Sequence, residues 1–441
     1  MSVQLLAGEK GWPRVVMARA GAYDPDGGLA TAEAAGAWAA WRRAVADLAP
    51  ETVIRLVGEA GLRGRGGAGY PTADKWRICR AQPSGQRYAV ANGYEADPGT
   101  ATDRTLMESD PHGVLEGLAL AAFAVGATQA FVAVRADATT AVHRLATAIH
   151  EAEEAGIIGS AALGGRVDLH VELRELQGAF VLGEETVLMR ALEGKRGMPE
   201  QRPPYPAVKG LWGAPTVVNN VATLAAVPWI LGHGPADFRA IGDPAAPGTA
   251  LVHVTGAVAR PGVVEVPTGT PLRAIVAAAG GSAGALKAVL VGGPSGGFLP
   301  AAALDTSYGQ AALAEAGAIV GSGALLVVDE SACIVELATL MERFMSEESC
   351  GKCVPCRIGT RRLTEIGERF TGGRARPADV RLLGDLAADV RDGSLCGHGI
   401  TAPNPLTSGL RHFAAEFDDH ISRGMCPAGV CTPLRVAGGI A

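Results

Sequence analysis

The sequence is poor in aromatic side chains, which make up 5% of its 441 residues. Hydrophobic residues still account for 48% of the chain, so small and aliphatic side chains must fill most of its interior. A basic surplus is also missing, because the formal net charge is −6. Proteins that bind nucleic acid normally carry a basic patch, and the composition therefore argues against a nucleic-acid partner.

No segment has the pattern of a membrane span or of a secretory signal. The longest uncharged stretch, residues 118–134, contains Gly126, Thr128 and Gln129, and we interpret it as a helix, a turn and a buried strand. The N-terminus lacks a basic region followed by an apolar core. We therefore expect a cytoplasmic protein without direct membrane insertion.

Hydrophobic patterning divides the first half of the chain into two parts. Residues 1–50 are a lead-in, in which we expect one helix over 31–48. Residues 51–240 alternate between expected strands at 87–92, 130–135 and 167–173 and expected helices at 115–125 and 141–155. Such alternation favours an α/β domain with a mostly parallel sheet and helices on its faces.

A segment rich in glycine and proline, residues 232–248, marks the next boundary. Residues 249–330 contain short β runs at 251–255, 262–266, 288–291 and 324–328 and one helix at 272–279, which favours a small β-grasp module. From residue 331 to 441 apolar residues recur at helical spacing. We expect a C-terminal helical bundle there.

Seven of the eight cysteines lie at or after position 333, and in a cytoplasmic chain such clustering indicates metal or redox chemistry. Cys350, Cys353 and Cys356 have the C-x2-C-x2-C spacing that can wrap a [4Fe–4S] cluster. We predict Cys396, in a glycine-flanked turn, as the fourth ligand. The main alternative is a tetrahedral zinc site made by the same four cysteines.

A glycine-rich loop, residues 61–72, precedes an expected helix that contains Lys75. Unhindered backbone N–H groups, the helix N-terminus, Arg65 and Lys75 together suit a phosphate. No Gly-Lys-Ser/Thr closes the loop as in a Walker A motif, and no strand is expected directly before it. Because the chain has 60 glycines, the loop alone leaves a flexible surface loop as the alternative.

Together these features resemble the NADH-oxidising flavoprotein subunit of respiratory complex I and the diaphorase subunits of NAD-dependent hydrogenases and formate dehydrogenases. The resemblance covers nearly the whole chain. Its motifs are Gly64-Arg-Gly-Gly-Ala-Gly-Tyr-Pro-Thr72, Asn92-Gly-Tyr-Glu-Ala-Asp-Pro-Gly99 with Asp103-Arg104, Gly183-Glu-Glu-Thr186, Glu193-Gly-Lys-Arg-Gly197, Arg202-Pro-Pro-Tyr-Pro206, Gly213-Ala-Pro-Thr-Val-Val-Asn-Asn-Val221 and Glu348-Ser-Cys-Gly-Lys-Cys-Val-Pro-Cys-Arg357.

The resemblance implies an NADH:acceptor oxidoreductase subunit with FMN in the α/β domain and a soluble-ligand-binding-like β-grasp module. A hydride would pass from NADH to FMN, and single electrons would then pass through one [4Fe–4S] cluster to partner subunits. The cofactors supply this chemistry, so no acid/base triad is expected. The implied partners are a thioredoxin-like [2Fe–2S] subunit and a larger acceptor subunit, such as a hydrogenase or formate dehydrogenase.

The resemblance also assigns residues by position. FMN would be held by Gly64, Arg65, Gly66, Gly67, Lys75, Asn92, Gly183, Glu184, Asn219, Asn220 and Thr223. NADH would contact Tyr70, Asp97, Phe180, Glu185 and Tyr205. A carboxylate at Glu185, near the adenosine ribose, favours a free 2′-hydroxyl and hence NADH over NADPH.

Three positions depart from the family pattern. Tyr94 stands where an aspartate is usual near the flavin ring, Asp97 stands where a glutamate is usual, and Ile78 stands where an adenine-stacking aromatic is common. Tyr94 motivates an alternative function: a flavin-free scaffold and electron relay that keeps the fold and the cluster.

The tail motif Cys426-Pro-Ala-Gly-Val-Cys431 is similar to a segment in the flavin subunits of multimeric hydrogenases. Together with Cys333 and His420 it offers three sulfurs and one imidazole, a set that suits tetrahedral zinc. Our hypothesis is one structural zinc site that ties the tail to the helical bundle. Reduced, shielded cysteines and a second iron–sulfur centre are the alternatives.

Overall fold

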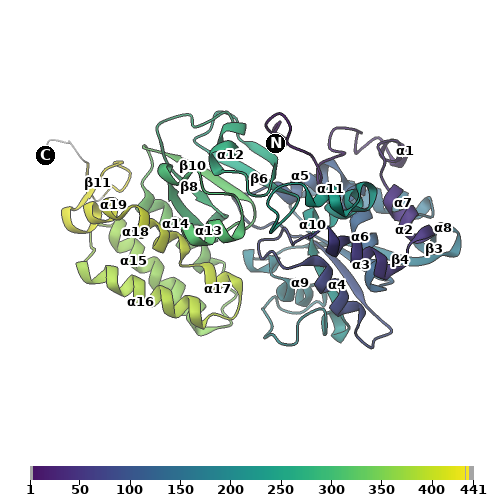
Figure 1. Ribbon diagram of the computed structural model, residues 1–441. Coiled ribbons are helices and arrows are strands. Elements are labelled where there is room, and N and C mark those ends of the chain that lie inside the picture. Colours follow the sequence, from purple (N-terminus) through teal and green to yellow (C-terminus); the bar gives the residue numbers. More distant parts are fainter. Residues whose placement is uncertain (1–2, 433, 437–441) are drawn as a thin grey trace.

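The computed structural model describes residues 3–432 and 434–436 and contains two five-stranded sheets and a helical region (Figure 1). The first sheet has the order β3-β4-β2-β1-β5. Its strands are β1 (Tyr88–Gly93), β2 (Gln129–Arg135), β3 (Gly159–Ala161), β4 (Val167–Leu176) and β5 (Thr216–Asn220). All neighbours are parallel except β3, which is antiparallel to β4. Strand β5 was not predicted from the sequence. It pairs with β1 in parallel, so the carboxyl ends of the two strands lie side by side.

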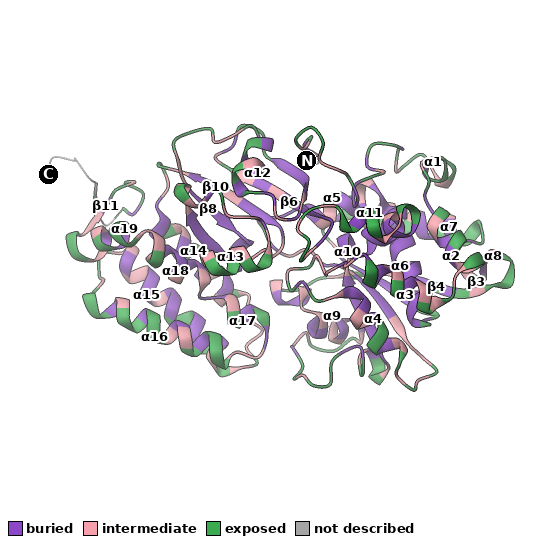
Figure 2. Ribbon diagram, viewed as in Figure 1, coloured by how far each residue is buried: buried purple, intermediate pink, exposed green. Residues whose placement is uncertain are grey.

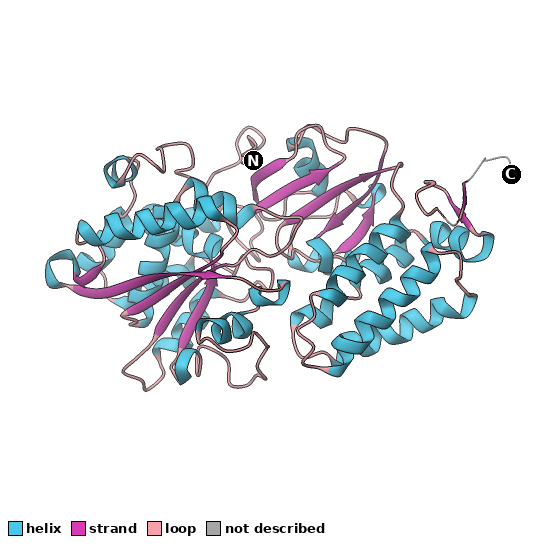
Figure 3. Ribbon diagram, turned by 180° about the vertical axis from the view of Figure 1, so that it is seen from behind, coloured by secondary structure: helices cyan, strands magenta, loops and turns pink. Residues whose placement is uncertain are grey.

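Helices lie on both sides of this sheet (Figure 3). They are α3 (Pro50–Glu59), α4 (Thr72–Arg80), α5 (Thr102–Ser109), α6 (Pro111–Val125), α7 (Thr139–Glu154), α8 (Ala162–Gly165), α9 (Glu185–Leu192), α10 (Val221–His233) and α11 (Pro235–Arg239), with short turns η1 (Phe180–Gly183) and η2 (Leu211–Gly213). None of the described helices is long and apolar enough to cross a membrane.

The uncharged stretch 118–134 folds as expected, because local signals bound α6. The Asp110 side chain caps its N-terminus by accepting from Gly113 N–H at 2.9 Å, and Pro111 occupies the first turn. Gly126, with a φ of 79°, ends the helix before β2 begins. Almost every side chain of α6 is buried, which explains its nearly uniform apolar sequence.

The prediction of a single helix over residues 31–48 is wrong. The segment forms α1 (Leu29–Ala34) and α2 (Ala39–Asp47), separated by Gly36 and Trp38 in left-handed conformations. Trp38 is fully buried, and its indole N–H donates to His112 Nδ1 at 3.1 Å. Burial of this large ring on α6 therefore outweighs continuation of the helix, an effect that local periodicity does not contain.

The second sheet has the order β7-β6-β10-β8-β9 and is mixed, because β6 and β10 are parallel and the other neighbours antiparallel. Its elements are β6 (Thr249–Gly256), β7 (Gly262–Pro267), α12 (Leu272–Ala278), β8 (Leu286–Val291), η3 (Gly293–Ser295), β9 (Gly297–Pro300), η4 (Ala301–Ala303), α13 (Gln310–Ala316) and β10 (Ala324–Asp329). The four expected β runs and the helix are present, whereas β9 and α13 were not anticipated.

The chain after β10 is mainly helical, and it packs against the second sheet at the far end from the first (Figure 1). Its elements are α14 (Ile334–Glu347), η5 (Pro355–Thr360), α15 (Arg361–Thr371), α16 (Pro377–Gly393), α17 (Gly397–Thr401), α18 (Asn404–His412), α19 (Ala414–Asp418), η6 (Asp419–Arg423), β11 (Met425–Cys426) and β12 (Arg435–Val436). Residues 437–441, the end of the expected helical domain, lie outside the described part. Figure 2 shows most strands of both sheets buried, whereas β3 and much of β4 are exposed or half-buried.

The lead-in fastens itself to both sheet regions through buried carboxylates. Glu265 in β7 accepts the backbone N–H groups of Val15, Val16 and Met17 at 2.8–3.0 Å. Glu116 in α6, fully buried, pairs with Arg19 at 3.1 Å. Each carboxylate is thus compensated for the cost of burial, and the two sheet regions share one N-terminal strap.

Glu342 in α14 is also a buried carboxyl group, but its burial is not compensated. Neither of its oxygens has a hydrogen-bond partner within the described residues. Burial raises its pKa well above the ordinary glutamate value. The folded protein therefore holds a proton that the unfolded chain releases above about pH 4.3, and stability falls as pH rises toward the folded pKa, by at most about 1.4 kcal/mol per pH unit.

Glu342→Gln should remove this pH dependence. We expect variant and wild type to unfold at similar temperatures near pH 4, where the glutamate of the unfolded chain is still largely protonated, and the variant to unfold at the higher temperature at pH 8. Thermal unfolding at both pH values measures the gap. Glu347→Gln, at an exposed position of the same helix, is the matched control. Parallel pH profiles for wild type and Glu342→Gln would contradict the prediction.

Candidate functional site

The carboxyl edge of the first sheet gathers most of the residues predicted to bind FMN. Strands β1 and β5 run side by side and in parallel, with Asn92 in register with Asn220. Ligands of open α/β sheets bind at this edge, where neighbouring strands connect in opposite directions. The Asn92 amide donates to the Gly183 carbonyl at 2.8 Å, which brings the turn η1 over the same strand end.

The glycine-rich loop approaches this edge so closely that side chains would not fit. A Cβ on Gly66 would lie 3.2 Å from the Asn220 Cβ. Gly67 has a φ of 100°, and a Cβ there would lie 2.9 Å from the Gly321 carbonyl oxygen, in the loop before β10. The loop therefore presents bare backbone between β5 and the second sheet, as close approach to a phosphate requires.

Side chains around the loop are fixed by specific hydrogen bonds. Lys75 Nζ lies 2.9 Å from the Glu185 carboxylate and donates to the Val218 carbonyl at 3.0 Å. The indole N–H of Trp76 donates to Asn219 Oδ1 at 2.9 Å. The edge thus holds the Lys75 ammonium group and the amides of Asn219 and Asn220. These donors suit a ligand with phosphate and hydroxyl groups.

Arg65 contributes differently from the prediction. Its backbone N–H donates to Thr223 Oγ1 at 2.8 Å, whereas its guanidinium turns away and bonds the Pro247 carbonyl. Burial lowers the pKa of Arg65 to about 10. The guanidinium borders a cavity of about 60 Å³ between the loop and the second sheet, with Tyr308 and Ser322 on its wall. A space this small does not accommodate a flavin.

Glu184 and Glu185 lie at the start of α9 and share Arg202, whose guanidinium is 3.5 Å from the Glu184 carboxylate. Glu184 caps the helix by accepting from Thr186 N–H at 2.9 Å. Glu185 pairs with both Lys75 and Arg202, the latter at 3.0 Å. The Arg202 guanidinium also lies 5.9 Å from the centre of the Tyr205 ring. Tyr70 and Tyr205 are 49% and 58% exposed, so both predicted aromatic faces are open to a ligand.

Two of the side chains predicted to contact NADH, Asp97 and Phe180, contact other protein residues. The Asp97 carboxylate is buried, accepts from Gly99 N–H at 2.7 Å and bonds the Ser322 hydroxyl of the second-sheet region. Phe180 packs on Phe344 and His398 of the helical region, with ring centres 5.6 and 5.8 Å apart. Both side chains therefore join parts of the fold to one another.

The three departures from the family pattern also have defined places. Tyr94 is buried, and its hydroxyl donates to the Gly178 carbonyl at 2.7 Å. Asn92 and Tyr94 thereby hold the two ends of the 178–183 segment. Ile78 is 39% exposed on α4.

A half-buried acidic pair next to the edge, Glu95 and Asp103, belongs to one of the family motifs, but no role was predicted for it from the sequence. Glu95 accepts the backbone N–H groups of Asp103 and Arg104 at 2.9 and 3.1 Å, and Asp103 accepts from the Asn220 amide at 2.6 Å. Burial and the neighbouring Glu95 carboxylate raise the pKa of Asp103 well above its ordinary value. Glu95 thus fixes the start of α5, and Asp103 orients the Asn220 amide. We call the glycine-rich loop and the carboxyl edge of β1 and β5 together the cradle.

The predicted iron–sulfur ligands come from two turns of the helical region. Cys350 and Cys353 precede the π-helical turn η5, which contains Cys356, and Cys396 caps the start of α17. A Cβ on Gly399 would lie 3.0 Å from the Cys356 Cβ, so the two turns touch. Burial raises the pKa of the Cys356 thiol to about 12, and a bound cation would have to stabilise its thiolate.

The spread of these cysteines favours a cluster over a single ion. Three or more ligand atoms mutually within 4.8 Å occur in one group of the described residues, and Cys350, Cys353, Cys356 and Cys396 are not that group. One zinc ion holds its sulfurs about 3.8 Å apart, given Zn–S bonds of about 2.3 Å. A [4Fe–4S] cube spaces its ligands more widely, because each cysteine binds a different corner.

The cradle and the cysteine cluster share one apolar core. Tyr94, Leu182 and Val218 pack in the same buried group as Cys396, and Cys350 packs against it. Phe180 N–H also donates to the Glu348 carboxylate at 2.5 Å, two residues before Cys350. Lys352, which lies between the first two cluster ligands in the sequence, donates to the Pro199 carbonyl at 2.5 Å. The two sites are therefore joined directly by protein.

The four residues predicted to bind zinc are the one such close group among the described residues. Cys333, His420, Cys426 and Cys431 are buried, and their ligand atoms lie within 4.8 Å of one another.

Comparisons with known proteins agree with this arrangement. Three family models match: the Nuo51 FMN-binding domain at residues 57–229, the SLBB domain at 251–299 and the NADH-ubiquinone oxidoreductase-F iron–sulfur binding region at 336–420. The chain is 44% identical to the HndC subunit of the NADP-reducing hydrogenase of Solidesulfovibrio fructosivorans, over 88% of this chain and 80% of that one. It is 41% identical to the F 2 subunit of the NADH-quinone oxidoreductase of Rhizobium meliloti, over 91% and 97%.

A solved structure is similar over most of the chain. The crystal structure of an NAD+-reducing [NiFe]-hydrogenase in the H2-reduced state superposes with a TM-score of 0.80 at 37% identity. The match covers 87% of this chain and 65% of the hydrogenase chain.

Proposed function

We infer the function of this chain from its family, since it belongs to the NADH-oxidising flavoprotein subunits of respiratory complex I and related hydrogenases. It is an oxidoreductase subunit that carries FMN and a [4Fe–4S] cluster and passes electrons to partner subunits. The observation that carries this function is the shared apolar core of Tyr94, Leu182, Val218 and Cys396, which joins the carboxyl edge of the sheet to the cluster ligands.

We propose that the carboxyl edge of β1 and β5 holds FMN. When bound, FMN supplies the change from two-electron to one-electron chemistry that this function needs. Backbone N–H groups of Gly64, Gly66 and Gly67 would face its phosphate, with Lys75 as the nearby cation. Arg65 would contribute its backbone, because its guanidinium is bound to Pro247. Asn92, Gly183, Glu184, Asn219, Asn220 and Thr223 complete the proposed set.

We propose that NADH lies against the exposed rings of Tyr70 and Tyr205, with Glu185 at its adenosine ribose. Phe180 would shape this site from its position in η1, where its ring packs on Phe344 and His398 of the helical region. Asp97 would act indirectly, because its carboxylate is bound to Ser322. The cluster ligands would be Cys350, Cys353, Cys356 and Cys396.

Glu185→Gln tests the proposed preference for NADH. Loss of the Glu185 charge frees the Arg202 guanidinium to accept a 2′-phosphate, whereas Lys75 is assigned to the FMN phosphate. We expect the ratio of kcat/KM for NADPH to that for NADH to rise roughly tenfold, equivalent to about 1.4 kcal/mol. Steady-state reduction of an artificial acceptor measures it, with Glu59→Gln as control. An unchanged ratio would place the adenosine ribose elsewhere.

We also propose the finer organisation of the protein. Residues 51–240 would be the FMN and NADH domain, 249–330 a β-grasp module and 331–441 a helical iron–sulfur bundle, after the lead-in 1–50. The mixed sheet with α12 and the run of helices after β10 support this division. A [2Fe–2S] subunit and a larger acceptor subunit would be its partners. Eight unpaired cysteines support a reducing, cytoplasmic location.

The colour of the purified protein tests the function. We expect flavin bands on a broad iron–sulfur absorbance, both bleached by NADH without oxygen. The family relationship disfavours the flavin-free relay, which predicts cluster absorbance, no extractable FMN and no response to NADH. That second result would overturn the proposed function.

A further inference from the structure

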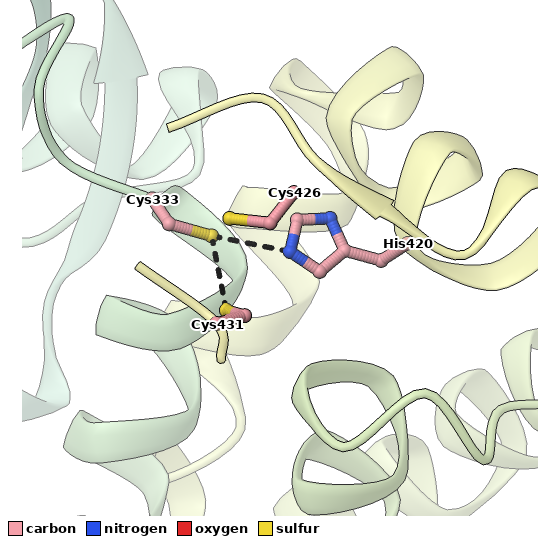
Figure 4. A group of neighbouring side chains, drawn as sticks. All are labelled: Cys333, His420, Cys426 and Cys431. Carbon is pink, nitrogen blue, oxygen red and sulfur yellow. Dashed lines mark hydrogen bonds between the residues drawn. The ribbon is translucent and has the colours of Figure 1, made fainter. Parts of the chain in front are cut away.

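Four buried metal-ligand side chains converge at the end of the helical region, away from the FMN cradle and the cluster. The Cys333 sulfur lies 3.4 Å from His420 Nε2 and 3.9 Å from the Cys431 sulfur, and Cys426 faces the same point (Figure 4). All four residues are at most 5% exposed. A separation of 3.9 Å excludes a disulfide between Cys333 and Cys431, whose sulfurs would be about 2.05 Å apart.

The ligands come from two distant parts of the chain. Cys333 precedes α14 and caps it, with its sulfur accepting from Glu336 N–H at 3.4 Å. His420 lies in η6, and Cys426 lies in β11. A turn through Gly429, whose N–H donates to the Cys426 carbonyl at 3.0 Å, then returns the chain to Cys431. The tail thus supplies three ligands and the start of α14 supplies the fourth.

The spacing matches one tetrahedral zinc ion. With Zn–S bonds of about 2.3 Å and a Zn–N bond of about 2.0 Å, a tetrahedron puts sulfurs about 3.8 Å apart and sulfur and nitrogen about 3.5 Å apart. The observed 3.9 and 3.4 Å agree with both values. Four protein ligands in a fully buried position leave no open coordination site, which is typical of structural rather than catalytic zinc.

Neighbouring groups already orient the imidazole. His420 Nδ1 lies 2.8 Å from the Glu416 carbonyl oxygen, which fixes the proton on Nδ1 and leaves Nε2 free to bind a metal. The Glu416 carboxylate in turn accepts from Ile334 N–H at 3.0 Å and pairs with Lys287 of β8 at 3.0 Å. Through Glu416, His420 is therefore connected to the start of α14 and to β8 of the second sheet.

We propose that Cys333, His420, Cys426 and Cys431 bind one structural zinc ion that fastens the C-terminal tail to the start of α14 and to the second sheet. The site is separate from the electron path. Helix α14, with 14 residues, extends about 21 Å from Cys333 toward the Cys350 turn. Loss of zinc should thus loosen the tail and leave the flavin and the [4Fe–4S] cluster in place.

Metal analysis of the full chain tests this proposal. We expect about one zinc ion beside about four iron atoms per chain. Cys426→Ser should lower zinc below roughly a fifth of an equivalent, while iron, FMN and NADH-dependent bleaching stay at wild-type levels. Cys79→Ser, at another buried cysteine, should retain zinc.

Cobalt provides a readout that does not depend on a variant folding. Wild-type protein exchanged with Co²⁺ should show the visible bands of a tetrahedral thiolate site, and added Zn²⁺ should abolish them. Wild-type protein with less than half an equivalent of zinc and four freely titrating thiols would overturn the proposal. About eight iron atoms per chain would overturn it in favour of a second cluster. Both results leave the NADH-dependent bleaching of the proposed function untouched.

Discussion

Replacing Cys396 with alanine should remove the [4Fe–4S] cluster and block electron transfer to a partner, while NADH still reduces the flavin. Cys396 lies at the start of α17, against the turn that holds Cys356, and it packs in the apolar group that also contains Tyr94 and Leu182. It is therefore a proposed cluster ligand that packs in one buried group with side chains of the FMN and NADH domain. Without it three cysteines remain, and a complete cluster requires four.

The experiment separates the two halves of the function. Iron should fall from about four atoms per chain toward zero, and reduction of a protein acceptor should fall to background. Flavin reduction in a stopped-flow mixing experiment should keep its rate. Cys79→Ala is the control, because Cys79 is also buried but lies on α4. Loss of FMN from Cys396→Ala would show that the shared core, rather than the cluster alone, depends on this side chain.

Local sequence signals were sufficient where they act within one element. The end of α6 before Gly126 and the strands around the helix were predicted, whereas α6 begins at Pro111 and not at residue 115 as expected. The split between α1 and α2 was not predicted, because it depends on Trp38 reaching His112, a residue 74 positions away. Strand β5 was also missed, since its five residues carry no alternation and two are the asparagines Asn219 and Asn220.

For the candidate site, motifs identified residues but not the direction of their side chains. Lys75, Asn92, Asn219 and Asn220 meet at the carboxyl edge of the sheet, as the family pattern implies. The Arg65 backbone N–H donates to Thr223, whereas its guanidinium turns to the Pro247 carbonyl. Such a choice is made by packing between distant segments, which spacing along the sequence does not encode.

The contact between the second sheet and the glycine-rich loop explains why the loop is rigid enough to select a ligand. Gln310 at the start of α13 donates to the Gly67 carbonyl at 3.0 Å, and the Gly321 carbonyl lies over Gly67. The second-sheet region therefore supports the loop that we propose to bind the FMN phosphate. This support is a cause of affinity, because a preorganised loop loses less conformational entropy when the ligand binds.

Gly67→Ala tests that role and should weaken FMN binding strongly. An alanine at a φ of 100° is strained, and its Cβ would lie 2.9 Å from the Gly321 oxygen, so the loop must move away from its support. Strain of about 1–3 kcal/mol corresponds to roughly a 5- to 150-fold weaker FMN complex if binding requires the original loop. Quenching of FMN fluorescence on adding the apoprotein measures the dissociation constant.

Gly85→Ala is the matched control, because that glycine has open space around its Cβ position and no positive φ. We expect it to bind FMN as the wild type does. Iron content should stay at the wild-type level in both variants, since neither glycine contacts the cysteine turns. If Gly67→Ala retains wild-type FMN affinity, the loop does not depend on its fixed position against the second sheet, and the phosphate must be held by the Lys75 side of the cradle instead.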